Sequence, residues 1–182
     1  MFAAGDSTVI YATTEPGEAL LLGGNTAVFD GGELLQYGPK AEVFHTPQSL
    51  RVARAFSDLP MNLVLALPVA QGMQLVNGPT LVMALPAQPD VSLTAGIRGS
   101  ALRIEARAGD AALPGKVELA EISGSSTYVH VATAAGELVA QLTGVHYFEL
   151  GTPPTLYIDP AQVYLLNTAG DLMGAPVRKT GR

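Results

Sequence analysis

The sequence has 182 residues, a formal net charge of −6, no cysteine and no tryptophan. The absence of cysteine excludes disulfides, thiolate metal sites and a cysteine nucleophile. An acidic chain with only 6% aromatic residues lacks the positive field and the stacking faces of a nucleic-acid-binding protein, and it is poorly suited to an anionic membrane surface.

The sequence predicts neither a membrane span nor a secretion signal. The longest apolar run, residues 63–70, is interrupted by Pro68 and is far shorter than the roughly 20 residues that cross a bilayer. Residues 1–6 lack the basic and apolar regions of a signal peptide. We therefore expect a cytoplasmic location.

The first predicted elements are a strand and a helix. Residues 7–13 are rich in β-branched and aromatic side chains and predict a buried strand. Thr14 is the predicted N-cap of the helix that follows, because a threonine hydroxyl can accept a hydrogen bond from the first turn. Pro16 suits that first turn, and Gly23-Gly24 ends the helix.

A hairpin and two short helices are predicted next. Residues 26–29 and 33–37 read as strands, and residues 30–32 (DGG) predict a tight turn, because glycine adopts positive φ at little cost. One helix is predicted around residues 41–44, after a Gly-Pro pair, and another over residues 48–56.

The remainder of the chain predicts β-structure. Short strand-like runs alternate with turn signals rich in Gly, Pro, Asn and Ser, a spacing typical of a small closed or sandwiched barrel rather than of βαβ units. The predicted strands are residues 63–69, 74–76, 80–84, 93–97, 116–122, 127–132, 137–142, 155–158 and 163–166.

Charge divides the chain near residue 59. From residue 60 to residue 97 the only charged side chain is Asp90. A segment this apolar is not a flexible linker, since linkers and disordered segments are polar. We expect it to be buried in a core, in an interface, or in both.

The sequence offers no complete catalytic or metal-binding motif. Neither G-x-x-x-x-G-K-[ST] nor G-x-G-x-x-G is present. His45, His130 and His146 have no second ligand three or four residues away, so we interpret them as one helix residue and two strand residues rather than as metal ligands. The basic ending at residues 178–182 is typical of a disordered terminus.

The serines and paired acids also have structural interpretations. Ser123, Ser125 and Ser126 lie in a predicted turn without the strand-to-helix elbow that exposes a nucleophile. Glu118 and Glu121 are interpreted as solvated strand positions.

Several segments together resemble one family. Residues 9–19 (VIYATTEPGEA), 30–39 (DGGELLQYGP), 42–47 (EVFHTP) and 60–62 (PMN) resemble consecutive landmarks at the end of the nucleotide-binding domain of ATP-binding cassette (ABC) importer ATPases of the sugar-importing type. Residues 96–98 (GIR), 115–131 and 158–166 (IDPAQVYLL) resemble the C-terminal regulatory OB-type barrel of these proteins, the TOBE domain. The resemblance covers essentially the whole chain.

The resemblance implies a fold and a division into domains. Residues 1–58 would be the α/β C-terminal piece of the nucleotide-binding domain, and residues 59–182 would be the TOBE regulatory barrel, which makes the protein mainly β. Such a chain looks like a C-terminal fragment. The phosphate-binding loop, the signature helix and the Walker B acid of the family lie before the strand that begins here at Ser7, so we expect this chain alone neither to bind nor to hydrolyse ATP.

The resemblance also implies partners and a role. The fragment would be the regulatory and dimer-forming region of an importer subunit for a carbohydrate or polyol, coupling ATP-driven dimer closure to transport. The intact parent would be an ATPase subunit that uses ATP and Mg, lies peripherally on the inner face of the cell membrane, and contacts permease subunits. A second ATPase subunit, identical or different, would pair with it through the barrel, with residues 60–97 as the expected contact, and no nucleic acid is implied.

The sequence departs from the family at the switch position. Where the family places its switch histidine this chain has Thr14, and the following acid is present as Glu15. The resemblance implies that this histidine reaches the terminal phosphate and helps to orient the attacking water, whereas threonine is shorter and does not titrate. We hypothesise that the intact subunit has a weakened ATP site and works beside a competent ATPase subunit. The variant resembles importers with two non-identical ATPases, including some for glycerol and related polyols.

A second departure follows Arg98. The family usually continues with Pro-Glu-His after Gly-Ile-Arg, whereas this chain has Gly99, Ser100 and Ala101. Regulatory contacts made there by relatives are therefore in doubt, and we expect Arg98 to form a structural ion pair with an acid near the barrel mouth.

Two alternatives stay open. A free-standing TOBE or OB-type module could bind a small ligand or an oxyanion such as molybdate, although residues 1–58 would then have no explanation. A nucleic-acid-binding OB-fold is the second, and the negative charge and the scarcity of aromatic residues disfavour it.

Overall fold

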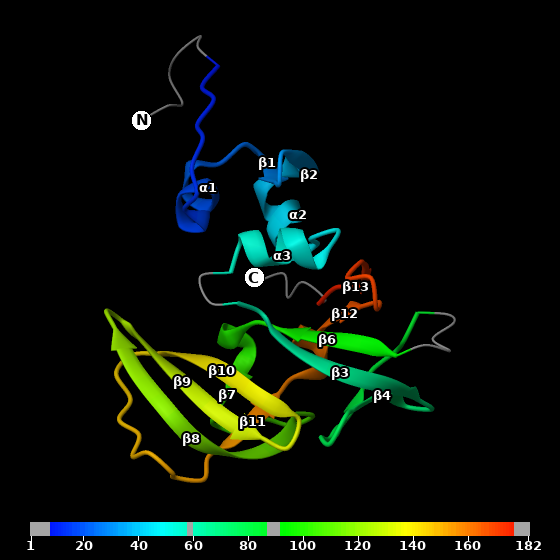
Figure 1. Cartoon of the computed structure of the whole chain (residues 1–182), viewed down its shortest axis with the longest axis vertical. Helices are drawn as coiled ribbons and strands as arrows, with labels where there is room; N and C mark the ends of the chain where they lie inside the picture. The colour runs from blue at the N-terminus through cyan, green and yellow to red at the C-terminus, as the bar shows by residue number, and fades with distance from the viewer. Residues whose placement is uncertain (1–7, 58–59, 87–91, 177–182) are drawn as a thin grey trace.

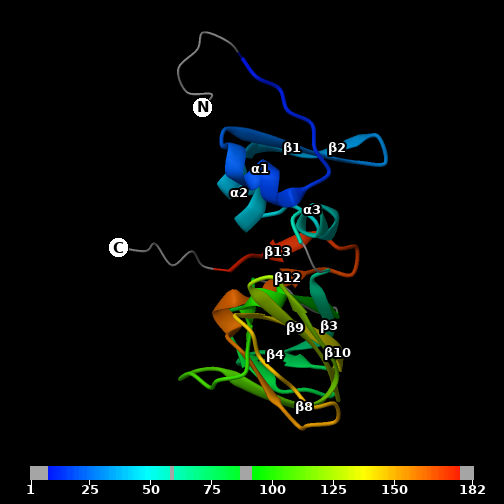
Figure 2. The same cartoon turned by 90° about the vertical axis from the view of Figure 1, so that its left-hand side faces the viewer.

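The computed structural model describes residues 8–57, 60–86 and 92–176. Within these ranges the chain forms three sheets and three short α-helices. The helices and a two-stranded sheet, from residues 8–57, lie on one end of a barrel built from residues 60–176 (Figures 1 and 2). The prediction of a mainly β protein, an OB-type barrel preceded by an α/β segment, is confirmed.

The α/β part contains the predicted hairpin and helices. Its elements are α1 (Pro16–Leu22), β1 (Asn25–Asp30), β2 (Glu33–Pro39), α2 (Lys40–His45) and α3 (Leu50–Ala55). Strands β1 and β2 pair in antiparallel fashion, and Gly31 and Gly32 form the turn with φ of 58° and 82°. A small apolar cluster then holds the helices on the hairpin. Its buried members are Val28, Val43, Val52 and Phe56.

Two predictions for the start of the chain are wrong. Residues 8–13 form no strand, and Ile10 is 93% exposed, because β1 and β2 pair only with each other among the described residues and an extended segment without a partner has no ladder hydrogen bonds. The N-cap of α1 is Glu15, with no side-chain capping bond. Because Pro16 occupies the first helical position, Thr14 lies one residue too early to cap the helix.

One sheet of the barrel has five antiparallel strands in the order β10-β9-β8-β11-β7. The strands are β7 (Leu102–Arg103), β8 (Ala111–Ser123), β9 (Ser126–Thr133), β10 (Gly136–Thr143) and β11 (Thr155–Ile158). Strand β8 is longer than predicted and contains a bulge between Val117 and Leu119. The two-residue strand β7 carries no local sequence signal.

The other sheet has six strands in the order β13-β12-β6-β3-β4-β5. They are β3 (Asn62–Val69), β4 (Gly72–Leu75), β5 (Thr80–Val82), β6 (Leu93–Ile97), β12 (Tyr164–Leu166) and β13 (Leu172–Gly174). Two 3-10 turns, η1 (Gly99–Ala101) and η2 (Pro160–Gln162), lead into β7 and β12. The sequence did not predict β13.

The core lies between these two sheets. Alternate side chains of each strand point inward, as the period of two requires. Fully buried large side chains come from both sheets: Met73, Leu75, Leu81, Leu93, Ile97, Leu113, Leu138, Leu156 and Ile158.

Asn62 connects the two sheets. This buried side chain donates to the carbonyls of Ile97 (3.1 Å) and Val139 (3.0 Å) and accepts from the Val139 amide (2.7 Å). The amide group of Asn62 thus acts as a peptide-like partner for the open edge of β10, which helps to close the barrel.

Candidate functional site

Thr14 and Glu15 lie in the exposed segment that leads into α1. The neighbouring hydroxyls of Tyr11 and Thr13 donate to Glu18 Oε2, at 3.2 Å and 2.5 Å. The negative charge of Glu18, and then its hydrogen bond, raise the pKa of Tyr11. Because Thr14 and Glu15 face solvent, any ligand that they touch has to be held mainly by other residues.

The three histidines do not converge. His45 packs its ring edge-on against Phe44 at 5.0 Å, His130 Nδ1 lies 3.0 Å from Glu137 Oε1, and His146 Nε2 lies 2.9 Å from the Thr143 carbonyl. Among the described residues no group of three or more His, Cys, Asp or Glu side chains is placed to hold a metal ion. The prediction that His146 lies in a strand is wrong, because β10 ends at Thr143 and the chain turns at Gly144 with φ of 90°.

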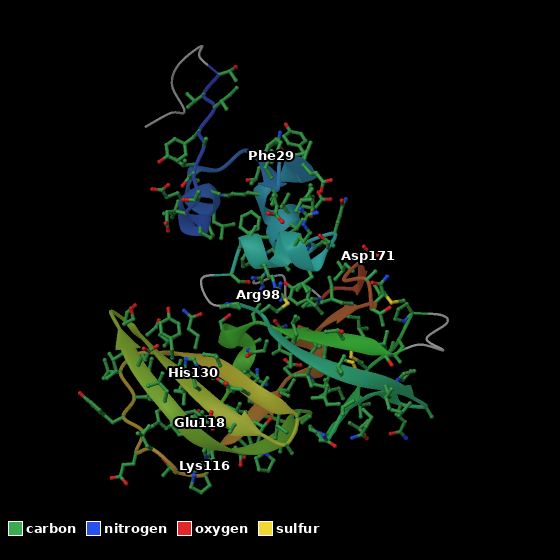
Figure 3. All side chains as sticks on the ribbon, viewed as in Figure 1. Phe29, Arg98, Lys116, Glu118, His130 and Asp171 are labelled. Atoms are coloured by element: carbon green, nitrogen blue, oxygen red, sulfur yellow. The ribbon has the colours of Figure 1, made fainter. Side chains whose placement is uncertain are left out.

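The serines and acids on and after β8 lie at or next to their predicted positions. Ser123 ends β8, Ser126 begins β9, and Ser125 lies in the exposed turn between them. Glu118 and Glu121 are exposed on β8, and Figure 3 shows Glu118 on the outside of the barrel. The exposed strand positions predicted for Glu118 and Glu121 are confirmed, as is the turn position of Ser125, whereas the strands extend further than predicted and include Ser123 and Ser126. The basic ending at residues 178–182 lies outside the described residues.

Arg98 is the polar centre of the junction between the α/β part and the barrel (Figure 3). It follows β6, and its guanidinium donates to the carbonyls of Phe44 (3.1 Å) and Phe56 (3.2 Å), to Ser57 Oγ (3.3 Å) and to the Tyr164 hydroxyl (3.3 Å). The Arg98 Cζ atom also lies 4.4 Å from the ring centroid of Phe44 and 5.4 Å from that of Tyr164.

Among the residues that the structure describes, Arg98 does not form the predicted ion pair with an acid. Its partners are carbonyl and hydroxyl oxygens and aromatic faces, which a planar guanidinium satisfies together. The sequence places a cation at the end of β6, but the partners lie 41 to 66 residues away. No local signal could have identified them.

A backbone seam and an apolar contact complete the junction. The Leu50 amide donates to the Gly170 carbonyl (2.8 Å), the Leu172 amide donates to the Gln48 carbonyl (3.1 Å), and Ser49 forms a β-bridge with Asp171. Figure 3 shows Asp171 on the side of the barrel that faces the α/β part. The apolar contact consists of Ala53, Met61 and Tyr164, each no more than 4% exposed.

A charged cluster on the barrel was missed in the sequence. Arg103 on β7 forms an ion pair with Asp110, whose side chain is 3% exposed. A terminal nitrogen of Arg103, Nη1, also lies 3.9 Å from Asp159 Oδ2. The hydrogen bond from Arg103 lowers the pKa of Asp110, burial opposes this effect, and the Arg107 amide lowers the pKa further. The cluster joins β7, the start of β8 and the turn after β11. These charges come from separate segments, so only the fold brings them together.

The segment at residues 60–97, whose only charge is Asp90, has two different faces. Its inward side chains fill the core, as predicted, whereas Leu65, Leu67, Val69 and Val82 are between 40% and 64% exposed. Val69 and Val82 both pair with Gly72, and Leu67 pairs with Gln74. Directly paired residues share a face of a sheet. These four apolar side chains, which we call the outer apolar face, therefore lie together on the outside of β3 and β5.

Comparison with known proteins places these features in a family context. Residues 95–166 match the model of the TOBE domain family. The chain is 27% identical over 174 residues to an alpha-glucoside transport ATP-binding protein of Rhizobium meliloti, covering 91% of this chain and 48% of that protein. It is 36% identical over 138 residues to an sn-glycerol-3-phosphate import ATP-binding protein of Rhizobium etli, covering 75% of this chain and 37% of the relative.

Other similarities are more distant. A maltose/maltodextrin import ATP-binding protein of Yersinia pestis is 25% identical over 175 residues, covering 91% of this chain and 47% of the relative. The cytoplasmic molybdate-binding protein ModG aligns with a TM-score of 0.40 and 14% identity, over 57% of this chain and 94% of that one. The chain spans about half the length, or less, of the import proteins that it matches. No helix among the described residues is long and apolar enough to cross a membrane.

Proposed function

We propose that this chain is the C-terminal regulatory and dimer-forming region of an ABC importer ATPase subunit. Residues 95–166 match the TOBE domain family, and the chain is similar over most of its length to an import ATP-binding protein. The observation that carries the proposal is the extent of this similarity, which at 91% of the chain includes the α/β part as well as the barrel. A binding module consisting of the barrel alone would leave residues 1–58 without a role. The division into residues 1–58 and 59–182 belongs to the same proposal.

The names of the relatives support a proposal for the class of the transported solute. The relatives quoted above are named for alpha-glucoside, sn-glycerol-3-phosphate and maltose/maltodextrin. We infer a carbohydrate or polyol as the solute class, with permease subunits as membrane partners and the inner face of the cell membrane as the location. In this arrangement the barrel couples closure of the ATP-driven dimer to transport.

The nucleotide chemistry is assigned to the rest of the parent protein. Thr14 and Glu15 are exposed side chains with no phosphate-binding loop in the sequence, and phosphoryl transfer requires a phosphate cradle, a magnesium site and an oriented water. ATP and Mg would therefore bind in the intact parent, with this chain supplying the segment that carries Thr14. We expect the isolated chain to leave a fluorescent ATP analogue unbound. Saturable binding would contradict this assignment.

Thr14 makes the ATP site of the parent weak. A hydroxyl cannot replace the reach or the charge of an imidazole at that position. In the full-length subunit, Thr14→His should raise ATPase activity, whereas the same substitution at Thr13, one residue earlier, should not. An unchanged rate for Thr14→His would remove the argument for a second, competent ATPase subunit.

The outer apolar face is the proposed contact with a second ATPase subunit. Leu65, Leu67, Val69 and Val82 form an apolar patch in a segment whose only charge is Asp90, and exposed apolar patches of this kind are covered by partners. Leu67→Glu should reduce the dimer fraction in light scattering. Leu119→Glu is the matched control, since Leu119 is 43% exposed against 49% for Leu67 and lies on β8 of the other sheet. A strict monomer at high concentration would rule out a self-pairing barrel.

The natural gene provides the most direct test of the whole proposal. An upstream reading frame that encodes G-x-x-x-x-G-K-[ST] would supply the missing phosphate cradle. A gene that begins at this chain, with no such frame, would instead favour a separate ligand-binding module.

A further inference from the structure

The junction between the α/β part and the barrel contains polar backbone groups that the helices themselves cannot satisfy. Phe44 lies in the last turn of α2, and Phe56 is the C-cap of α3. Carbonyls in the last turn of a helix have no amide partner within the helix. When such carbonyls are covered by another part of the protein, they require a donor from outside.

Arg98 supplies that donor from the barrel. One terminal nitrogen of Arg98 donates to the Phe44 carbonyl, and the other donates to the Phe56 carbonyl and to Ser57 Oγ. The guanidinium therefore contacts the ends of both helices at once, while Nε donates to Tyr164 of β12. The carbonyl end of a helix also carries partial negative charge, which favours a cation.

The aromatic contacts restrict the orientation of this guanidinium. Phe44 from the α/β part and Tyr164 from the barrel each present a ring to it, at 4.4 Å and 5.4 Å. Phe56 packs edge-on against Phe44 with ring centroids 6.1 Å apart. The hydrogen bonds hold the guanidinium in its plane, and a ring from each part contacts its face. Together these contacts restrict rotation of the α/β part relative to the barrel.

We propose that Arg98 is a positioning residue that locks the α/β part and the barrel into one orientation. The backbone seam at residues 48–50 and 170–172 and the apolar contact of Ala53, Met61 and Tyr164 bring the two parts together, and Arg98 adds a directional polar attachment at the ends of α2 and α3. Apolar packing fixes no single orientation, whereas hydrogen bonds to both helix ends resist rotation about the seam. The proposal concerns contacts within this chain and holds whether or not the chain belongs to an importer.

The absence of cysteine allows a direct measurement, because paired labels can be placed without background. Spin labels at Glu42→Cys on α2 and Glu121→Cys on β8, both exposed positions, report the distance between the two parts. Labels at Gln71→Cys and Glu121→Cys report the barrel alone. We expect a narrow distance distribution for the first pair of labels in the otherwise unchanged chain, and a broad one when Arg98→Ala is added. Arg54→Ala, an exposed arginine on α3, should leave it narrow.

The second pair and a second variant separate positioning from general stability. Arg98→Lys keeps the charge, but a single ammonium cannot serve both carbonyls and stack between the rings, so it should broaden the first distribution less than alanine does. Hydrogen exchange of the α3 amides should be about tenfold faster in Arg98→Ala, the effect of losing a charge-assisted hydrogen bond. An unchanged first distribution in both variants would overturn the proposal. Equal broadening of the barrel pair would also overturn it, because it would indicate a general loss of fold.

Discussion

The closure of the barrel by Asn62 leads to a quantitative prediction. Asn62 is only 7% exposed. Asn62→Ala removes three hydrogen bonds, of 2.7, 3.0 and 3.1 Å, and leaves the Val139 amide without the acceptor that Asn62 provides. At about 1 kcal/mol for each bond, the free energy of unfolding should fall by about 3 kcal/mol. For a chain of this length that corresponds to a Tm lower by roughly 6–12 °C.

The assay is thermal unfolding followed by circular dichroism, with urea unfolding as an independent measure of the same free energy. Asn25→Ala is the matched control, because Asn25 is an exposed asparagine with one hydrogen bond, to the Tyr37 hydroxyl at 3.1 Å, and should cost less than about 0.5 kcal/mol. Asn62→Asp keeps an acceptor for the Val139 amide but loses both donated bonds and buries a charge, so it should be at least as destabilising as alanine. If Asn62→Ala cost no more than the control, the bridging role assigned to Asn62 would be refuted.

Three further predictions concern packing and charge. Gly115→Ala should lower the free energy of unfolding by about 1–3 kcal/mol, since a Cβ at this position would overlap Val131 Cγ1 and lie 2.7 Å from the Ala132 carbonyl oxygen; a Tm equal to that of the wild type would contradict it. Asp110→Asn should lower the Tm at neutral pH, because the pKa of Asp110 is lower in the folded state than in the unfolded state, so its ionised carboxylate stabilises the fold. This stabilisation is complete above the unfolded pKa and is lost as the pH falls through the folded pKa, so the Tm difference between wild type and variant should shrink below about pH 4. A Tm difference that grows on acidification would contradict the pairing of Asp110 with Arg103. Arg51→Ala should leave the Tm close to that of the wild type, since its pairs at 2.8 and 3.0 Å are solvent-exposed and screened by water; a clearly lower Tm would indicate a further role for this side chain.

Short-range patterns account for what the sequence predicted correctly. The turn at Gly31 and Gly32 needs positive φ at adjacent residues, a requirement that the residues themselves reveal. Strands β6 and β11 match the predicted ranges 93–97 and 155–158, because alternating burial within a few residues determines them.

The wrong predictions share a different cause. Residues 8–13 have the composition of a strand, yet they remain extended and exposed without a partner in the described chain. Conversely, β13 lacks a strong local signal and forms by pairing with β12. A strand requires a ladder of hydrogen bonds with another segment, so composition alone neither ensures nor excludes it.

For the candidate site, the sequence by itself determined the residue types and their order: Thr14 where the resemblance places a histidine, a segment from residue 60 to residue 97 with Asp90 as its only charge, and a cation, Arg98, after β6. The tertiary structure decided what these residues contact. It turned Leu65, Leu67, Val69 and Val82 outward as the outer apolar face, and it brought Arg98 to helix ends 42 and 54 residues earlier in the chain. The reason is physical: the unpaired carbonyls that attract the guanidinium exist only once the helices have ended and the barrel has packed against them.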